Sequence, residues 1–331
     1  MITVVVPEML LRGCRPGYPS KDVDAKTVDA WIAEANEAKV RTILCLLDDA
    51  QLEYYRQVGA GGLLSRYHAA GFAVIHRPVA DHQRPAVSDE LLQRIAADFL
   101  AAELPLLIHC SAGMDRTGAV IEYLAHKTEL PVFRMNVTSL MQKYESVRRN
   151  AHFVQVTRLA LRLYDELENE HRLAPRYRSV LWAAAMLHDI GTAVKSPPVG
   201  HAWRSGKLIL DHAGQLKCPV KLMTVEEIAT VAALHGIDNT TPDDPLGRLY
   251  APIIGLWPGD EIPRELQILA GILRVADGLD RDLHQTVQDV KLSGDTLQVI
   301  AAKNVTENIY RAQKKLPLLC AVVKHLTICA T

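Results

Sequence analysis

Apolar residues in the first part of the chain alternate between short runs and helical spacing. The short runs have the length of buried strands and lie at residues 2–6, 42–47, 73–79 and 104–108. Helical spacing is found at residues 21–40 and 88–102. Strands that alternate with helices predict an α/β domain with a central, mostly parallel sheet.

Two stretches interrupt this alternation. Residues 12–19, R-G-C-R-P-G-Y-P, are rich in glycine and proline and predict a turn. Residues 52–70 have helical spacing that is broken at Gly59, Gly61 and Gly62. We read these glycines as a helix break and assign them no chemistry.

The pattern changes in the second half, where long helical stretches dominate. Helices are expected at 151–170, 177–189, 203–213, 224–236, 265–280 and 306–327, with a small strand pair around 290–300. An amphipathic helix at 137–150 ends the alternating part. We therefore predict an α/β domain at 1–148 and a mainly α domain at 149–331, since 331 residues exceed one average core.

Composition narrows the classes of function. A net charge of -1 gives no overall attraction to nucleic acid or to an anionic membrane. No run of eighteen apolar residues and no basic leader are present, which predicts a protein without membrane insertion or export. The six cysteines form no C-x-x-C pairs, so no disulfide or zinc framework is suggested, and we expect a cytoplasmic protein whose thiols stay reduced. The oligomeric state stays open.

One segment carries reactive groups between a predicted strand and a predicted helix. It reads H-C-S-A-G-M-D-R-T-G from His109 to Gly118. A loop of this length can fold its N–H groups around a phosphate at a helix N-terminus, which favours the thiolate of Cys110 as a nucleophile. Thr117 can donate a hydrogen bond to the leaving sulfur. The phosphate-binding residues would be Ser111, Ala112, Gly113, Met114, Asp115 and Arg116.

This segment resembles the signature loop of the cysteine-dependent protein-tyrosine and dual-specificity phosphatases. The resemblance implies hydrolysis of phosphate monoesters through a phosphocysteine, with no metal cofactor, and a loop-supporting role for His109. It also implies a carboxylic acid that protonates the leaving group. Asp81, in the predicted loop at 80–87, fits that role, although a turn residue is the plainer interpretation. Asp115 competes for the same role.

The A-G-x-D-R part of the loop resembles phosphatases that act on lipid and inositol phosphates. This favours a small or multiply phosphorylated substrate, while a phosphoprotein stays open. The turn at 12–19 is also loosely similar to the entry segment of bacterial dual-specificity-like phosphatases.

Histidines and aspartates recur on the predicted helices of the second domain. His152 and His188 each share a helix face with apolar residues, so both should point inward. Asp189 follows His188 directly, and Asp277 lies on the helix at 265–280. The order H…HD…D resembles the HD-domain metal-dependent phosphohydrolases. His201 and His235 lie where dinuclear members have additional ligands.

This second resemblance implies one or two divalent ions, drawn from Fe, Mn, Zn, Co or Mg. The implied reaction is hydrolysis of a small phosphorylated molecule, such as a nucleotide, an inositol phosphate or polyphosphate. The flanking sequence is similar to the HD region of the exopolyphosphatase/guanosine-pentaphosphatase family, whose ATPase-fold half this chain lacks. Residues 237–263 would cover the metal site, and bound phosphate could contact Arg204, Lys207 and Arg281.

These observations favour a tandem phosphatase with two separate chemistries. A first alternative is that one domain is catalytic and the other senses a phosphate ligand as a regulatory module. A second alternative is a scaffold that recognises phosphorylated partners through two inactive pockets. The intact Cys110, Arg116, His188 and Asp189 argue against the scaffold.

Overall fold

The structure is a computed structural model of the chain, and its contacts divide the protein into two compact units, Met1–Pro131 and Val132–Thr331. The predicted boundary at residue 148 differs from this division. Helix α6 (Leu130–Tyr144) packs within the second unit, where Phe133 lies edge-on to Trp182 with ring centroids 6.2 Å apart. The structure describes residues 2–126, 129–144, 150–195, 200–219, 223–236, 255–257, 259, 261–301 and 303–330.

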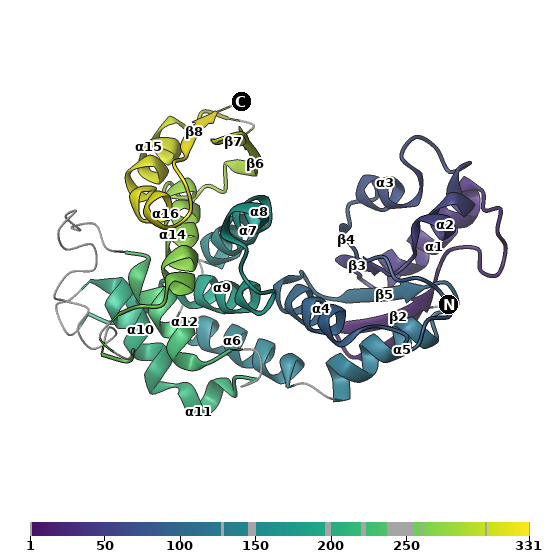
Figure 1. Ribbon diagram of the computed structural model, residues 1–331, viewed down its shortest axis with the longest axis horizontal. Helices are drawn as coiled ribbons and strands as arrows, with labels where there is room; N and C mark the ends of the chain where they lie inside the picture. Colours follow the sequence, from purple (N-terminus) through teal and green to yellow (C-terminus); the bar gives the residue numbers. More distant parts are fainter. Residues whose placement is uncertain are drawn as a thin grey trace. The chain divides into compact units, whose positions relative to one another are not determined.

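The first unit is built on a five-stranded sheet in the order β1-β2-β5-β3-β4 (Figure 1). Strands β2, β5, β3 and β4 are parallel to one another, and β1 is antiparallel to β2. This arrangement confirms the predicted α/β domain with a mostly parallel sheet. The strands are β1 (Ile2–Val6), β2 (Leu10–Cys14), β3 (Thr42–Cys45), β4 (Ala73–His76) and β5 (Leu106–Cys110).

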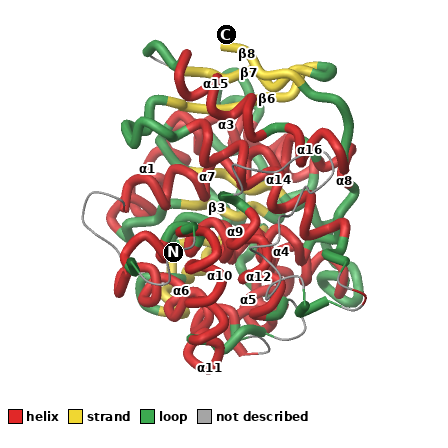
Figure 2. Tube along the Cα trace, turned by 90° about the vertical axis from the view of Figure 1, so that its left-hand side faces the viewer, coloured by secondary structure: helices red, strands yellow, loops and turns green. Residues whose placement is uncertain are grey.

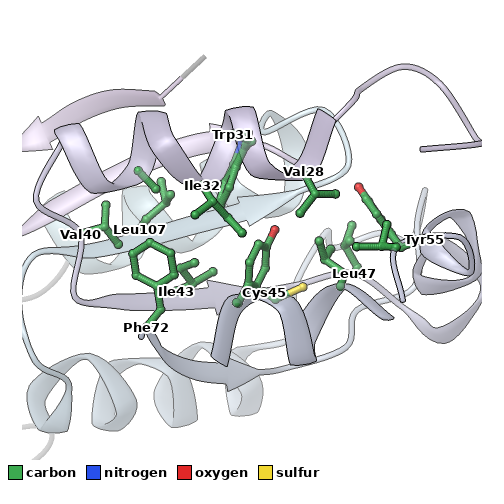
Figure 3. Packing of buried hydrophobic residues seen from close by; sticks show 14 of the residues in the cluster. Val28, Trp31, Ile32, Val40, Ile43, Cys45, Leu47, Tyr55, Phe72 and Leu107 are labelled. Carbon is green, nitrogen blue, oxygen red and sulfur yellow. The ribbon is translucent and has the colours of Figure 1, made fainter. Parts of the chain in front are cut away.

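Helices connect these strands and cover the sheet. They are α1 (Ala25–Glu37), α2 (Asp49–Leu52), the 3-10 turn η1 (Glu53–Tyr55), α3 (Gly62–Ala69), α4 (Asp89–Ala101), α5 (Asp115–Ile121) and the π-helical turn η2 (Glu122–His126). Helix α1 starts where the Asp24 side chain accepts a hydrogen bond from the Thr27 N–H. Its residues Val28, Trp31 and Ile32 project toward the sheet (Figure 3) and are buried there with Leu107 of β5.

The predicted turn at 12–19 is wrong in its first part, because Leu10–Cys14 forms strand β2. Every residue of β2 is paired in register with β5, and Cys14 lies opposite Cys110. Arginine and glycine give this segment little strand preference of its own. Pairing with the buried central strand β5 stabilises the strand conformation that the local sequence does not favour.

The second unit is mainly helical. Its helices are α7 (Asn150–Glu166), α8 (Glu168–His171), α9 (Arg176–Leu187), η3 (Ile190–Ala193), α10 (His201–Asp211), α11 (Ala213–Leu216), α12 (Val225–Leu234), α14 (Arg264–Leu279), α15 (Thr306–Lys315) and α16 (Pro317–Val322). Helix α14 is buried along nearly its whole length and packs against α7, α9, α12, α15 and α16.

The C-terminal part of this unit contains a three-stranded sheet, where the strand pair predicted from the sequence gains a third member. Its strands are β6 (Val287–Ser293), β7 (Thr296–Ala301) and β8 (Thr327–Ala330), which are labelled near the C-terminus in Figure 2. Strands β6 and β7 are antiparallel, and β8 is parallel to β7. The helix predicted at 306–327 is therefore divided into α15 and α16 and ends at Val322, before β8 begins. Pro317 lies at the first position of α16, where a proline suits a helix start.

Candidate active site and metal centre

Cys110 is the last residue of the central strand β5 and is 2% exposed. The neighbouring parallel strands end level with it, since Cys14 of β2 pairs with Cys110 and Cys45 of β3 pairs with His109. The carboxyl ends of parallel strands share one edge of the sheet, and the loops that follow them meet there. The fold thus surrounds the thiol with three different loops.

The loop after Cys110 is held in shape by residues of β2 and by Arg15, which follows it. Gly113 has a φ of +71° and packs against the Gly13 backbone, so a side chain at this position would collide with it. The Arg12 guanidinium donates a hydrogen bond to the Gly113 carbonyl oxygen. Arg15, which is 2% exposed, donates from Nε to Ser111 Oγ at 3.2 Å. These braces of the loop could not be predicted from local patterns, because each joins residues about a hundred positions apart in the chain.

Arg116 is buried beneath the loop, and its guanidinium reaches the loops after β3 and β4. Nη1 donates to the Val79 carbonyl at 2.7 Å and to Gln51 Oε1 at 2.9 Å. Nη2 lies 3.1 Å from Asp81 Oδ1. Gln51 completes the triangle, because its Nε2 donates to Asp81 Oδ2 at 2.8 Å. The structure therefore brings Asp81 and Arg116 together, and it adds Gln51, a residue that no local motif had indicated.

Asp115, the competing acid, begins helix α5 and is exposed, as is Met114 beside it. Thr117 is fully buried, and its Oγ1 has no hydrogen-bond partner among the described residues. The Thr117 hydroxyl is therefore available to donate a hydrogen bond to a nearby acceptor. His109 is also fully buried, and its Nε2 lies 3.2 Å from the Tyr67 hydroxyl. Burial lowers the pKa of His109 to about 4, so the ring is neutral near pH 7.

Six predicted metal ligands of the second unit converge from five helices. His152 lies in the first turn of α7, His201 begins α10, and Asp277 lies in the last turn of α14. His188 and His235 follow α9 and α12 directly, and Asp189 is next to His188. Helix ends are suited to this purpose, since each presents a side chain at the point where the backbone turns away.

Asp189 presents a different oxygen to each side of this cluster. Its Oδ1 is 3.2 Å from His201 Nε2 and 3.4 Å from His235 Nε2, while Oδ2 is 4.0 Å from His152 Nε2. Asp277 Oδ1 lies 3.4 Å from His152 Nε2 and 3.8 Å from His188 Nε2. Donors bound to one metal at about 2.0–2.2 Å are separated by roughly these distances.

Two overlapping groups result, each with donor atoms within 4.8 Å of one another. One consists of His152, His188 and Asp277, and the other of His188, Asp189 and His235. A carboxylate that faces both groups is the arrangement expected for a bridging ligand. The donor set of imidazoles and carboxylates suits divalent transition metals.

The histidine nitrogens provide a test of whether these residues fit a metal. His188 Nδ1 is 2.7 Å from the Ala185 carbonyl oxygen, and His235 Nδ1 is 2.6 Å from that of Ala232, so Nδ1 carries the proton in each neutral ring. Both Nε2 atoms are buried without a hydrogen-bond partner among the described residues. Burial also lowers the pKa of His235 to about 4. Each Nε2 thus directs a buried lone pair into the cluster without a hydrogen-bond donor, which costs free energy. A bound cation would satisfy both lone pairs.

Two further charged residues support the predicted ligands. Asp280, which is fully buried, accepts a hydrogen bond from His152 Nδ1 at 2.8 Å. Burial lowers the pKa of His152, but the bonds to Asp277 and Asp280 outweigh it and raise this pKa to about 9 in the absence of a metal. Lys315 of α15 forms an ion pair with Asp277 Oδ2. Asp280 could have been found from its spacing of three residues after Asp277, whereas Lys315 had no such signal.

A cavity of about 480 Å³ opens onto this cluster. Of the three cations predicted near it, Arg281 lines the cavity. Arg204 donates to the Gly191 carbonyl, and Lys207 pairs with Asp211 on an exposed helix face. Most of the segment predicted to cover the site, including 237–254, lies outside the described residues. The cavity is lined by His152, Asp189, Thr192, His201, Gly236, Asp277, Arg281, Leu283 and Lys315.

The two sites define two classes of phosphate-processing protein, one with a cysteine and arginine in a phosphate loop and one with a histidine and aspartate metal cluster. Comparison with protein families agrees: residues 21–128 match the family described as "Polymorphic toxin system, DSP-PTPase phosphatase", and residues 149–282 match the HD domain. The chain therefore contains a DSP-PTPase phosphatase domain followed by an HD domain, and both families are phosphate-directed hydrolases. No curated protein matches the chain. Within the described residues, none of the helices combines the length and the apolar character that a bilayer span requires.

Proposed function

We propose that the protein is a tandem phosphatase in which the first domain hydrolyses phosphate monoesters through a phosphocysteine. The observation that carries this proposal is the convergence of Arg116 and Asp81, 3.1 Å apart, at the loop that follows Cys110. The Cys110 thiolate attacks phosphorus, and the ester oxygen leaves with the proton of Asp81. Asp81 then takes a proton from water, whose oxygen attacks the phosphocysteine and releases inorganic phosphate and the thiolate.

Supporting residues stabilise the charges of these two steps. The Arg116 guanidinium binds two phosphate oxygens, and the Thr117 hydroxyl donates to the sulfur as it departs. Met114 and Asp115 are exposed at the same loop, so they would face the part of the substrate beyond its phosphate. We favour a small or multiply phosphorylated molecule over a phosphoprotein as the substrate, and a cytoplasmic location, since a reducing compartment keeps Cys110 as a thiol.

For the second domain we infer metal-dependent hydrolysis of a small phosphorylated molecule. His152, His188, Asp189, His201, His235 and Asp277 would hold one or two divalent ions. Such ions, when bound, generate hydroxide near neutral pH and neutralise phosphate charge. His152, His188 and His235 are oriented through their second ring nitrogens by Asp280, Ala185 and Ala232, respectively. A cavity of about 480 Å³ has the size of small-molecule sites.

Hydrolysis of an aryl phosphate in the presence of a chelator tests the first domain. Cys110→Ser should abolish this chelator-resistant activity, because a serine hydroxyl ionises far less readily than a thiol. Cys329→Ser changes an exposed cysteine in the same way and should have no effect. If Cys110→Ser keeps the activity of the parent protein, the assignment of the nucleophile is wrong.

Chelator-sensitive phosphate release from nucleotides, inositol phosphates and polyphosphate tests the second domain. His188→Ala combined with Asp189→Ala should abolish this release and leave the Cys110-dependent activity unchanged. Loss of both activities in this variant would instead favour the alternative in which the second domain regulates the first.

A further inference from the structure

Lys315 reaches the metal centre from a part of the chain beyond the HD match. The match ends at residue 282, whereas Lys315 is the last residue of α15. Helix α15 approaches α14 closely at Gly278, where an added Cβ would lie 2.7 Å from the Ala312 Cα. The absence of a side chain at Gly278 thus permits the contact that carries Lys315 to Asp277.

The ion pair of Lys315 leaves the ligand cluster open. Asp277 uses Oδ2 for Lys315 and directs Oδ1 to His152 and His188, at 3.4 Å and 3.8 Å. Lys315 therefore holds the carboxylate without occupying the oxygen that faces the histidines. An ammonium group has three N–H donors. One serves Asp277, and the Lys315 side chain also lines the cavity, where the other donors can meet a ligand.

Arg281 adds a second positive charge to the same cavity. It is exposed, and among the described residues it has no carboxylate partner. Both acidic residues of the cavity wall, Asp189 and Asp277, are already engaged with histidines or Lys315. Arg281 therefore supplies positive charge in addition to that of any bound metal, while Lys315 supplies the N–H donors that its ion pair with Asp277 leaves free. A ligand with a single phosphate would leave part of this charge unused.

We propose that Lys315 and Arg281 form an anion-binding wall that selects a small molecule with two adjacent phosphates, one at the ligand cluster and one at this wall. The proposal rests on the function proposed for the second domain and specifies its substrate class. It also assigns a substrate-binding role to the C-terminal extension beyond the HD match.

Equilibrium binding of methylenediphosphonate tests this proposal, because its P–C–P bridge resists hydrolysis. The full chain would carry Arg116→Ala, which disables the anion loop of the first domain. Calorimetry would compare Lys315→Met and Arg281→Met with Lys314→Met, after metal loading and with the metal content of each variant measured. Lys314 is the matched control, since it is the adjacent residue, is exposed and lies over the Tyr310 ring.

Lys315→Met should weaken methylenediphosphonate binding about tenfold or more, the usual effect of losing a charged hydrogen bond. Arg281→Met, an exposed change that leaves folding intact, should weaken it about threefold or more at low salt. Lys314→Met should stay within about twofold. Methylphosphonate, with one phosphorus, should discriminate less among the variants.

Equal binding by the Lys315→Met and Lys314→Met proteins at equal metal content would overturn the proposal. So would a loss of binding that only follows a loss of metal, because Lys315 would then merely support Asp277. Lys315-dependent binding without any metal-dependent hydrolysis would support the wall and refute the catalytic function. Metal-dependent hydrolysis that does not depend on Lys315 or Arg281 would support the catalytic function and refute the wall.

Discussion

The second unit should be stabilised by metal through His188 and Asp189. These residues are 0% and 8% exposed. His188 belongs to both groups of the cluster, and Asp189 belongs to the second and directs its other oxygen toward His152 of the first. Changing both to alanine should therefore remove binding at both positions. The wild-type protein should gain thermal stability when a chelated sample is given Mn²⁺ or Zn²⁺, and the double variant should not.

The size of this gain follows from linkage. A ligand that binds only the folded state at 100 to 1,000 times its Kd stabilises by about 3–4 kcal/mol. For a unit of this size, each kcal/mol raises the melting temperature by roughly 2–4 °C, so a rise of roughly 6–16 °C is expected. Alanine at His188 also leaves a cavity, but that cost is present with and without metal and cancels in the difference.

Differential scanning calorimetry with and without metal measures this difference, with bound metal quantified in parallel. His284→Ala with Asp282→Ala is a matched control, because it removes the same residue types from a pair outside the cluster in which His284 is 79% exposed. The control should respond to metal like the wild type. A metal-induced rise in the double variant equal to that of the wild type would refute the assigned centre, as would wild-type protein that binds no metal.

Three further predictions concern the first unit. Asp81→Asn should slow hydrolysis of esters with poor leaving groups by about 10²–10⁴-fold and affect activated aryl phosphates far less; if Asp115→Asn shows this pattern instead, Asp81 is not the acid. Gln51→Ala should reduce turnover of the same poor substrates about tenfold through loss of its bonds to Arg116 and Asp81, and an unchanged rate would contradict the positioning role. Because burial lowers the pKa of His109 to about 4, while the unfolded value is ~6.5, the unfolded chain takes up the proton first on acidification. His109 should therefore account for about 2 kcal/mol of the stability lost between pH 7 and pH 5 in urea unfolding, and an equal loss in the wild type and in His109→Gln would disprove this cause.

Features that depend on local sequence patterns could be predicted, whereas features that depend on long-range contacts could not. The Cys110 loop and the strand and helix alternation lie within short segments whose period or spacing is visible in the chain, the H…HD…D order is a recognisable series of local motifs, and the two-domain fold is confirmed. Strand β2 was missed because its pairing with β5 depends on tertiary contacts. Gln51 and Lys315 were missed for a related reason, since a contact between elements distant in the chain leaves no periodic trace in the sequence. The roles of Cys110, Asp81 and the six ligands remain predictions.

The braces of the phosphate loop have a practical consequence for dissecting this protein. Arg12 and Arg15 hold Gly113 and Ser111, yet both precede residue 21, where the match to the phosphatase family begins. A fragment cut at the edges of that match would keep the thiol, the arginine and the acid, but not the strand and side chains that hold the loop in shape. Such a fragment would be a poor test of catalysis, because a lack of activity would reflect a loop that has lost its shape and not the chemistry of its residues.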